Sequence, residues 1–205
     1  MRTLQTQAVA DLAWAGQHEQ AIAKATAALK RKKLVADERM ALLDLRSESH
    51  LALGDLKRAG DDARAMKLLA KQEGGAALQA RALCRESYVQ VRDADPRRGA
   101  TTAALALKAA ERSRVPELIG QALLRLGFAQ MSTRIDLPAA IRHATRAAAM
   151  FQRLGDDSLQ GRALQTLASA LWASGQLVAS RKAATEALGL ARQPVVTLGR
   201  FLDES

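Results

Sequence analysis

The side chains that most often carry catalysis or bind metals are few in this sequence and far apart. The three histidines are His18, His50 and His143, and none has a second ligand at the spacing of a metal-binding motif. A zinc site requires three or four converging ligands, and Cys84 is the single cysteine. We therefore predict structural or surface roles for the histidines, and no metal site.

Motifs that activate a nucleophile or hold a phosphate are also missing from the sequence. Gly74-Gly75 is not followed by Lys-Ser or Lys-Thr, and no serine lies in a Gly-x-Ser-x-Gly elbow. The carboxylate pairs Asp61-Asp62 and Asp156-Asp157 are interpreted as caps or dipole compensation at turns and helix starts. The sequence therefore predicts a protein that is not an enzyme and needs no cofactor.

The net charge of +10 over 205 residues favours an acidic partner, nucleic acid included. Solvated arginine on exposed helical faces would give the same charge without any ligand. Proteins that bind single-stranded nucleic acid stack bases on aromatic side chains, and only 3% of this chain is aromatic. Trp14, Trp172, Phe128 and Phe151 are predicted to pack between helices instead. Nucleic-acid binding is therefore an alternative that the sequence allows but does not favour.

The sequence also bears on cellular location. No stretch approaches the roughly 20 apolar residues that a membrane-spanning helix requires. Residues 1–17 lack the apolar segment and the small-residue cleavage site of a signal peptide. A single cysteine allows no intramolecular disulfide. We therefore expect a cytoplasmic protein with no membrane contact.

The elements that would position any binding residues are helices, and turn residues recur between them at intervals of about 40 residues. The turns lie at Gly16, Gly54, near Asp95, near Ile135 and at Gly175, between segments with apolar residues at helical spacing. One helix pair cannot bury its apolar face alone, so neighbouring pairs must stack. We predict an all-α fold, an α-solenoid of about five antiparallel helix pairs. The predicted helices span residues 3–15, 18–31, 37–53, 56–71, 76–92, 98–113, 116–131 and 137–153, and the fifth pair lies within 155–193.

Local signals refine these helices. The first pair is predicted to end in the basic run Lys30-Arg31-Lys32-Lys33, because cations in a last turn favour the negative end of the helix dipole. Asp37 is the predicted N-cap of the following helix. The third pair is the least regular in sequence, and its turn contains Pro96, which cannot lie inside a helix.

The last pair carries the clearest motif. It consists of Leu164, Leu167-Ala168 and Leu171, then Gly175, then Ser180, Ala184 and Ala187-Leu188. This pattern resembles a tetratricopeptide repeat (TPR). Equivalent positions recur as Gly16, Ala21, Ala25 and Ala28 in the first pair and as Gly54, Ala59, Ala63 and Met66 in the second.

The length of the repeat narrows the resemblance. The usual TPR has about 34 residues and a proline near its end, whereas these repeats are longer and mostly lack that proline. They resemble the roughly 40-residue variant of bacterial signalling and regulatory proteins. The segment Phe151-Gln152-Arg153-Leu154-Gly155-Asp156 is typical of that variant. The resemblance covers residues 2–192 and implies a right-handed superhelix.

The resemblance also implies where a ligand would bind, because the first helix of each pair lines the concave face of a TPR superhelix. It implies a non-catalytic protein- or peptide-binding scaffold or sensory module of a bacterial signalling or transcription-regulatory protein. The implied binding residues are Asp44, Glu48, Arg85, Glu86, Arg125, Arg162, Gln165, Ser169 and Trp172. Thr6, Gln7, Ala10, Leu45, Val89, Ala129 and Thr166 complete the implied lining.

Arg85, Arg125 and Arg162 would favour an acidic ligand in this groove. The alternative is that the charged residues only form the solvated side of each helix. One subset of TPR proteins, which includes Hsp90-type co-chaperones, clamps a C-terminal carboxylate with lysine, arginine and asparagine. This chain contains no asparagine, so that clamp is not expected here.

Two further interpretations concern the ends of the chain. The apolar first helix, with Leu4, Val9, Leu12 and Trp14, suits an oligomerisation scaffold in which an end pair packs on its copy.

The repeat domain is expected to span residues 1–193. Residues 194–205 depart from the helical pattern and are interpreted as a cap or as the start of a following domain. The partner would then be another domain of the same polypeptide.

Overall fold

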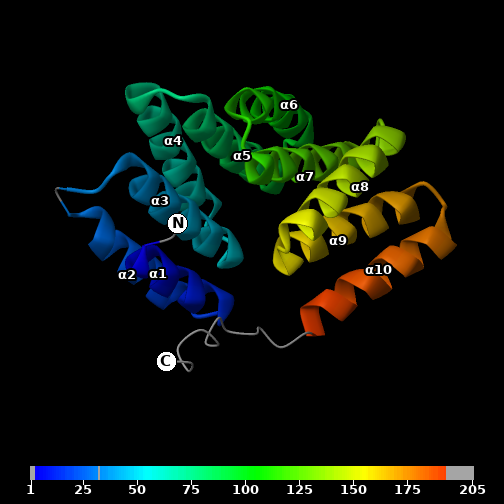
Figure 1. The fold of residues 1–205 in the computed structure, drawn as a ribbon, viewed down its shortest axis with the longest axis horizontal. Coiled ribbons are helices and arrows are strands. Elements are labelled where there is room, and N and C mark those ends of the chain that lie inside the picture. The colour runs from blue at the N-terminus through cyan, green and yellow to red at the C-terminus, as the bar shows by residue number, and fades with distance from the viewer. Residues whose placement is uncertain (1–2, 32, 193–205) are drawn as a thin grey trace, which may run out of the picture.

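The computed structural model describes residues 3–31 and 33–192, which form ten α-helices and no strand (Figure 1). The prediction of five helix pairs is confirmed, with helix bounds within a few residues of those expected. The predicted tail, residues 194–205, lies outside the described residues. The helices are α1 (Leu4–Trp14), α2 (His18–Leu29), α3 (Ala36–Ala52), α4 (Leu56–Glu73), α5 (Ala76–Arg92), α6 (Pro96–Ser113), α7 (Pro116–Thr133), α8 (Leu137–Leu154), α9 (Asp157–Ala173) and α10 (Leu177–Arg192).

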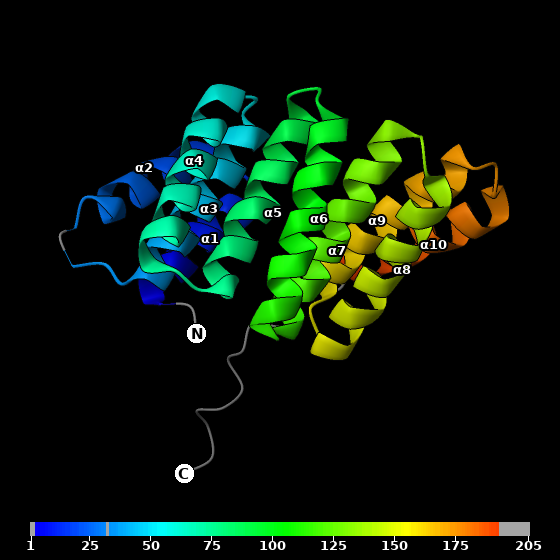
Figure 2. The same ribbon diagram turned by 90° about the horizontal axis from the view of Figure 1, so that it is seen from above.

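The helices form two layers. Each helix packs on its sequence neighbours, and α1, α3, α5, α7 and α9 also pack on one another in series. The even-numbered helices make no such contacts among themselves, so they form the outer layer of a curved array. Figure 1 shows this array as an open arch with α1 and α2 at one end and α10 at the other. Figure 2 shows the pairs following one another in chain order.

The core between the layers is built largely from alanine. Ala140, Ala144 and Ala147 are fully buried on α8 and face α7. A Cβ atom on Gly127 of α7 would lie 3.1 Å from the backbone nitrogen of Ala144. Small side chains at both positions therefore let the two helices approach closely. None of the helices in the described part of the chain is long and apolar enough to cross a membrane.

Polar groups join the two helices of the second pair and of the third pair. The buried hydroxyl of Ser47 donates to the carbonyl of Ala59 at 3.1 Å, and Ser87 donates to Gly99 at 2.8 Å. These two bonds join equivalent positions one repeat apart. They tie the first helix of a pair to the start of its second helix, which removes the need for a large apolar side chain there.

The third pair is packed as closely as the others, although its sequence predicted the least regular copy. Gly99 of α6 leaves no room for a Cβ atom, which would meet Val91 of α5 at 2.5 Å. Its turn holds Ala94 at φ 58°, a left-handed conformation that Gly54 supplies at φ 79° in the second pair. The turn is therefore conserved in shape although the glycine is absent.

Three predicted helix termini are wrong. Pro96, predicted to lie in a turn, is the first residue of α6, where proline is tolerated because its missing N–H would have no partner within the helix. Helix α2 ends at Leu29 with Lys30 as its C-cap, so no basic residue lies in its last turn. The amide of Arg31 bonds to the carbonyl of Ala28, which closes the helix before the basic run. Helix α3 begins after Val35, and Asp37 lies inside its first turn, where its carboxylate still favours the helix dipole.

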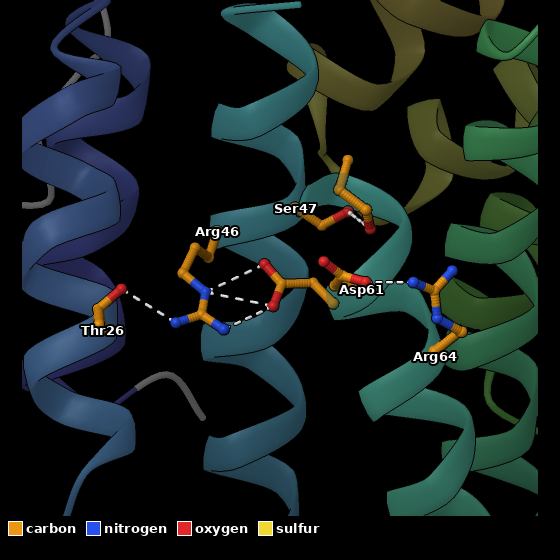
Figure 3. A network of polar contacts seen from close by, with 7 residues as sticks. Thr26, Arg46, Ser47, Asp61 and Arg64 are labelled. Carbon is orange, nitrogen blue, oxygen red and sulfur yellow. Dashed lines mark hydrogen bonds and ion pairs between the residues drawn. The ribbon is translucent and has the colours of Figure 1, made fainter. Parts of the chain in front are cut away.

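The Asp61-Asp62 pair does not cap a helix, because α4 begins at Leu56 and is capped by Asp55. Asp62 is buried and accepts hydrogen bonds from Nε and Nη2 of Arg46 at 3.0 and 2.6 Å. Arg46 also donates to the hydroxyl of Thr26 at 2.9 Å, so this cluster joins α2, α3 and α4 (Figure 3). By contrast, the prediction for Asp156 is confirmed, since its carboxylate caps α9.

The predicted packing of the aromatic residues is correct in the middle of the array and wrong at its ends. Phe151 is fully buried, and Phe128 is partly buried. Trp14 and Trp172 are 63% and 61% exposed. Both tryptophans lie in the last turn of an inner helix, on a face that no neighbouring helix covers.

Candidate ligand-binding groove

The predicted groove residues Asp44, Glu48, Arg85, Arg125 and Arg162 come together in one polar cluster, which we call the arginine cluster. They lie on the inner helices α3, α5, α7 and α9, one helix from each of four successive pairs. Because the repeat is about 40 residues long, Arg85 and Arg125 occupy the same register on neighbouring helices. Stacking of the inner helices therefore places like positions side by side.

Arg85 is the centre of the arginine cluster and is only 4% exposed. Its Nε donates to Asp44 Oδ1 at 2.7 Å, and its Nη2 donates to Glu48 Oε2 at 2.8 Å. Burial alone would lower the pKa of Arg85, but the two carboxylates outweigh it and raise that pKa. The prediction placed Arg85 as a cation facing a ligand, whereas its charge is already balanced within the protein.

Glu48 holds a second arginine from the far side of the groove. Its Oε1 lies 2.8 Å from Nη2 of Arg162 on α9. Burial opposes ionisation of Glu48, but the charges of Arg85, Arg162 and Arg125 hold its pKa well below the usual range. One carboxylate therefore bridges two arginines that lie on helices of different repeats.

Arg125 is held differently. Its guanidinium carbon lies 4.1 Å from the centre of the Tyr88 ring, a cation–π contact. The Tyr88 ring packs in turn on the ring of Phe128, with 5.5 Å between the two ring centres. Burial and the neighbouring charge of Arg85 lower the pKa of Arg125. Among the described residues, Arg125 has no carboxylate partner.

Comparisons with known proteins identify the architecture that carries this cluster. No protein-family model matches the chain, and no curated protein matches its sequence. Solved structures do match. A Podosopora anserina protein described as a kinesin light chain with nearly identical TPR-like repeats has a TM-score of 0.60 and 11% identity, over 91% of this chain and 93% of that chain. Its Q17M form gives a TM-score of 0.61 at 12% identity, over 91% and 92%. BtubC (BKLC) from P. vanneervenii has a TM-score of 0.59 and 16% identity, over 97% of this chain and 83% of that chain.

This is a TPR-like repeat fold. At these identities the likeness establishes the architecture and leaves the ligand open. In the TPR-like array, the inner helices that form the arginine cluster are the first helices of each pair, as the resemblance implied.

The remaining predicted groove residues lie outside the arginine cluster of the TPR-like array. Glu86 pairs with Lys67 of the outer helix α4 at 2.8 Å, so it is directed away from Arg85. On α9, the hydroxyl of Ser169 donates to the carbonyl of Gln165 at 3.0 Å. Gln165 and Trp172 are exposed and free to meet a ligand.

Sequence reasoning missed Arg81, Tyr88 and Gln121, which complete the surroundings of Arg85 and Arg125 in the TPR-like array. Arg81 and Gln121 lie four residues before these arginines and therefore share their helical faces. Tyr88 follows Arg85 by three residues for the same reason. Residues three or four positions from a groove arginine share its helical face, and the repeat of about 40 residues places equivalent positions on the next inner helix. Applying both spacings to Arg85 and Arg125 could have found these three residues.

The histidines do not approach one another. Burial lowers the pKa of His50, and that of His143, whose Nδ1 lies 2.7 Å from Gln130 Oε1. Histidine, cysteine, aspartate and glutamate nowhere gather in groups of three able to hold a metal within residues 3–31 and 33–192.

Proposed function

We propose that this chain is a protein-binding scaffold whose concave groove takes an acidic segment of a partner. The observation that carries the proposal is the arginine cluster, in which four inner helices place three arginines around two carboxylates. Within this cluster, arginines outnumber carboxylates by one. A partner carboxylate would find Arg162, which is 44% exposed, already positioned for an ion pair.

Helix α9 offers the most accessible part of this surface. Arg162, Gln165 and Trp172 are exposed there, on a helix whose opposite face packs on α7, α8 and α10. Arg162 and Trp172 lie ten residues apart on α9, about 15 Å along its axis. Such a spacing suits two anchors for one peptide, because arginine and tryptophan dominate binding energy at interfaces. The ligand would lie along α9 and meet the arginine cluster at Arg162.

The finer assignment rests on the sequence. The period of about 40 residues and the segment Phe151–Asp156 support a sensory or scaffold module of a bacterial signalling or transcription-regulatory protein. In such a protein the acidic segment would belong to a separate partner or to another domain of the same polypeptide. A cytoplasmic location is proposed on the same grounds.

The test uses a short fluorescein-labelled peptide of alternating glutamate and leucine residues, followed by fluorescence anisotropy. We expect saturable binding that Arg162→Glu abolishes and Trp172→Ala weakens. Arg181→Glu on the exposed face of α10 changes the net charge by the same amount and should bind as the parent does. Equal losses in Arg162→Glu and Arg181→Glu would contradict a groove site, as would binding of a lysine–leucine peptide.

A second candidate function is nucleic-acid association through the outer face of α8. Helix α8 contains Arg142, Arg146 and Arg153, all exposed, and no aspartate or glutamate. These arginines recur at helical spacing along one side. The affinity for DNA would then fall with salt, with a logarithmic slope near −0.9 for each phosphate neutralised. A flat salt response, or equal binding by Arg142→Gln/Arg146→Gln, would eliminate this candidate.

Self-association is a third candidate, supported by exposed apolar residues at both ends. Leu4 and Trp14 are exposed at the first pair, and Leu177, Val178 and Leu188 at the last. Terminal repeats of a solenoid need polar outer faces to stay monomeric. Sedimentation equilibrium should then show a dimer that Val178→Glu dissociates, and a monomer at high concentration would contradict this candidate.

A further inference from the structure

A small polar pocket lies among the inner helices α3, α5 and α7 of the second, third and fourth pairs. It has about 30 Å³ of free volume, enough for one or two water molecules or a small ion. It is too small to admit a peptide chain, so it is distinct from the proposed surface along α9. We call it the arginine pocket. Its lining residues are Asp44, Arg81, Cys84, Arg85, Gln121 and Arg125.

The charges that line the arginine pocket are mostly positive. Three guanidinium groups line it, and Asp44 is the only carboxylate among the lining residues. Asp44 already accepts a hydrogen bond from Arg85. Arg81 lies 3.4 Å from Asp37, whose side chain is 84% exposed, so water screens that pair. Glu48, just outside the lining, also accepts a hydrogen bond from Arg85, so Arg81 and Arg85 have carboxylate partners and Arg125 is the lining arginine without one among the described residues.

Arg85, which lines the arginine pocket, has one buried donor without an acceptor. Arg85 uses Nε for Asp44 and Nη2 for Glu48, whereas Nη1 is buried and has no hydrogen-bond partner among the described residues. Nearly all buried N–H groups in proteins are paired. An unpaired donor on a side chain that lines the pocket indicates that an acceptor belongs there.

The state of Arg125 is consistent with the same conclusion. Burial and the charge of Arg85 outweigh the opposite effect of Glu48 and lower the pKa of Arg125, and its contact with Tyr88 offers only the face of a ring. An anion in the pocket would offset both effects. The uncharged amide of Gln121, which donates to Glu117 at 3.1 Å, places no further charge there.

We propose that the arginine pocket binds a small free oxyanion, a carboxylate or a phosphate, between Arg81, Arg85 and Arg125. Guanidinium groups bind such anions through paired, charge-assisted hydrogen bonds. The bound anion would accept from Nη1 of Arg85 and join α5 to α7. The pocket shares Asp44, Arg85 and Arg125 with the arginine cluster, whereas the proposed peptide surface meets that cluster at Arg162 on α9, so either ligand could bind without the other.

The test measures thermal unfolding and isothermal titration of the whole chain with potassium phosphate, with sodium acetate and with sodium chloride at equal ionic strength. We expect a saturable rise in the unfolding midpoint with phosphate or acetate, as required when a ligand binds only the folded state. Comparing the phosphate and acetate titrations shows whether a tetrahedral or a planar oxyanion fits the pocket. Absence of a rise beyond that given by chloride would overturn the proposal and leave water as the occupant.

Variants locate the site. Arg125→Met should weaken the anion roughly tenfold, the loss expected for one charge-assisted hydrogen bond. Arg81→Met, at a more exposed position, serves the same purpose if Arg125→Met does not fold. Arg181→Gln on α10 should bind as the parent does. Unchanged affinity in whichever of the two pocket variants folds would overturn the assignment to this pocket.

Discussion

Nη2 of Arg162 lies 2.8 Å from Oε1 of Glu48, although α9 and α3 have no backbone contact and belong to the fifth and second pairs. The ion pair therefore spans the inside of the arch. An acidic ligand that binds Arg162 would compete with Glu48 for it. Ligand binding and the curvature of the array are then coupled through one side chain.

The first prediction is that Arg162→Gln opens the arch without unfolding it. The pair is partly exposed, so its loss should lower the free energy of unfolding by less than about 1 kcal/mol. Small-angle X-ray scattering should show an increased radius of gyration. High salt should have the same effect on the parent protein and little on the variant. An unchanged radius of gyration would show that the array holds its curvature without this contact.

Replacing Arg85 should lower the free energy of unfolding more than replacing Arg162 does. Arg85→Met removes two charge-assisted hydrogen bonds from the partly exposed carboxylates of Asp44 and Glu48, and it leaves Glu48 paired with Arg162 alone. We expect a loss of about 1.5–3 kcal/mol in the free energy of unfolding. The triple variant Arg85→Met/Asp44→Asn/Glu48→Gln should recover much of it, because the two carboxylates that faced Arg85 are then neutral, and Arg162, which loses Glu48, is 44% exposed to water. Urea denaturation measures the loss in Arg85→Met and its recovery in the triple variant. The matched control is Arg81→Met, and a loss in Arg85→Met no larger than in this control would contradict the central role of Arg85.

Much of the fold could be predicted because its signals are local. Turn residues, alanine stripes and prolines at helix starts each act within one helix pair, and the repeat of about 40 residues extends them to the whole array. The aspartates that cap α4, α6 and α8 lie at these turns for the same reason.

The groove residues were less predictable, because their surroundings depend on how the repeats stack. The spacing places Arg85 and Arg162 on inner faces, but it does not tell that one is buried between two carboxylates and the other reaches across the arch. Trp172 shows the opposite failure, since its apolar character suggested burial at a position where no helix covers it.

Acid should weaken the protein partly through Glu48. A glutamate in an unfolded chain titrates near pH 4.3, and the folded protein holds the pKa of Glu48 below this value. Ionised Glu48 therefore contributes stability above about pH 4.3, and this contribution is lost as the pH falls toward the folded pKa. Glu48→Gln should show a shallower fall in the free energy of unfolding between about pH 5 and pH 3. Glu19→Gln, on the exposed side of α2, is the control and should follow the parent curve.

Cys84 should report on the integrity of the arginine pocket. Burial raises the pKa of its thiol to about 12, so almost none is thiolate at neutral pH. Because thiolate is the reactive form, the native protein should resist iodoacetamide, and urea should make the thiol reactive. Mass spectrometry measures the modification. Rapid and complete alkylation of the native chain would contradict the enclosed position of Cys84.

Alanine substitutions at two helical glycines distinguish the effect of close helix packing from the effect of helix propensity. Gly161→Ala in α9 should raise the free energy of unfolding by about 0.5–1 kcal/mol, because its new Cβ would meet no atom closer than the carbonyl oxygen of Ala187 at 3.9 Å. Gly127→Ala gains the same propensity, but its Cβ would meet backbone atoms of Ala144 and Ala140 at 3.1 and 3.3 Å. Backbone cannot move aside as a side-chain tip can, so α7 and α8 must separate, and we expect a net loss of about 1 kcal/mol. Thermal and urea unfolding of both variants measure the difference. If Gly127→Ala stabilises the protein as much as Gly161→Ala does, close contact between α7 and α8 is not what requires glycine at position 127.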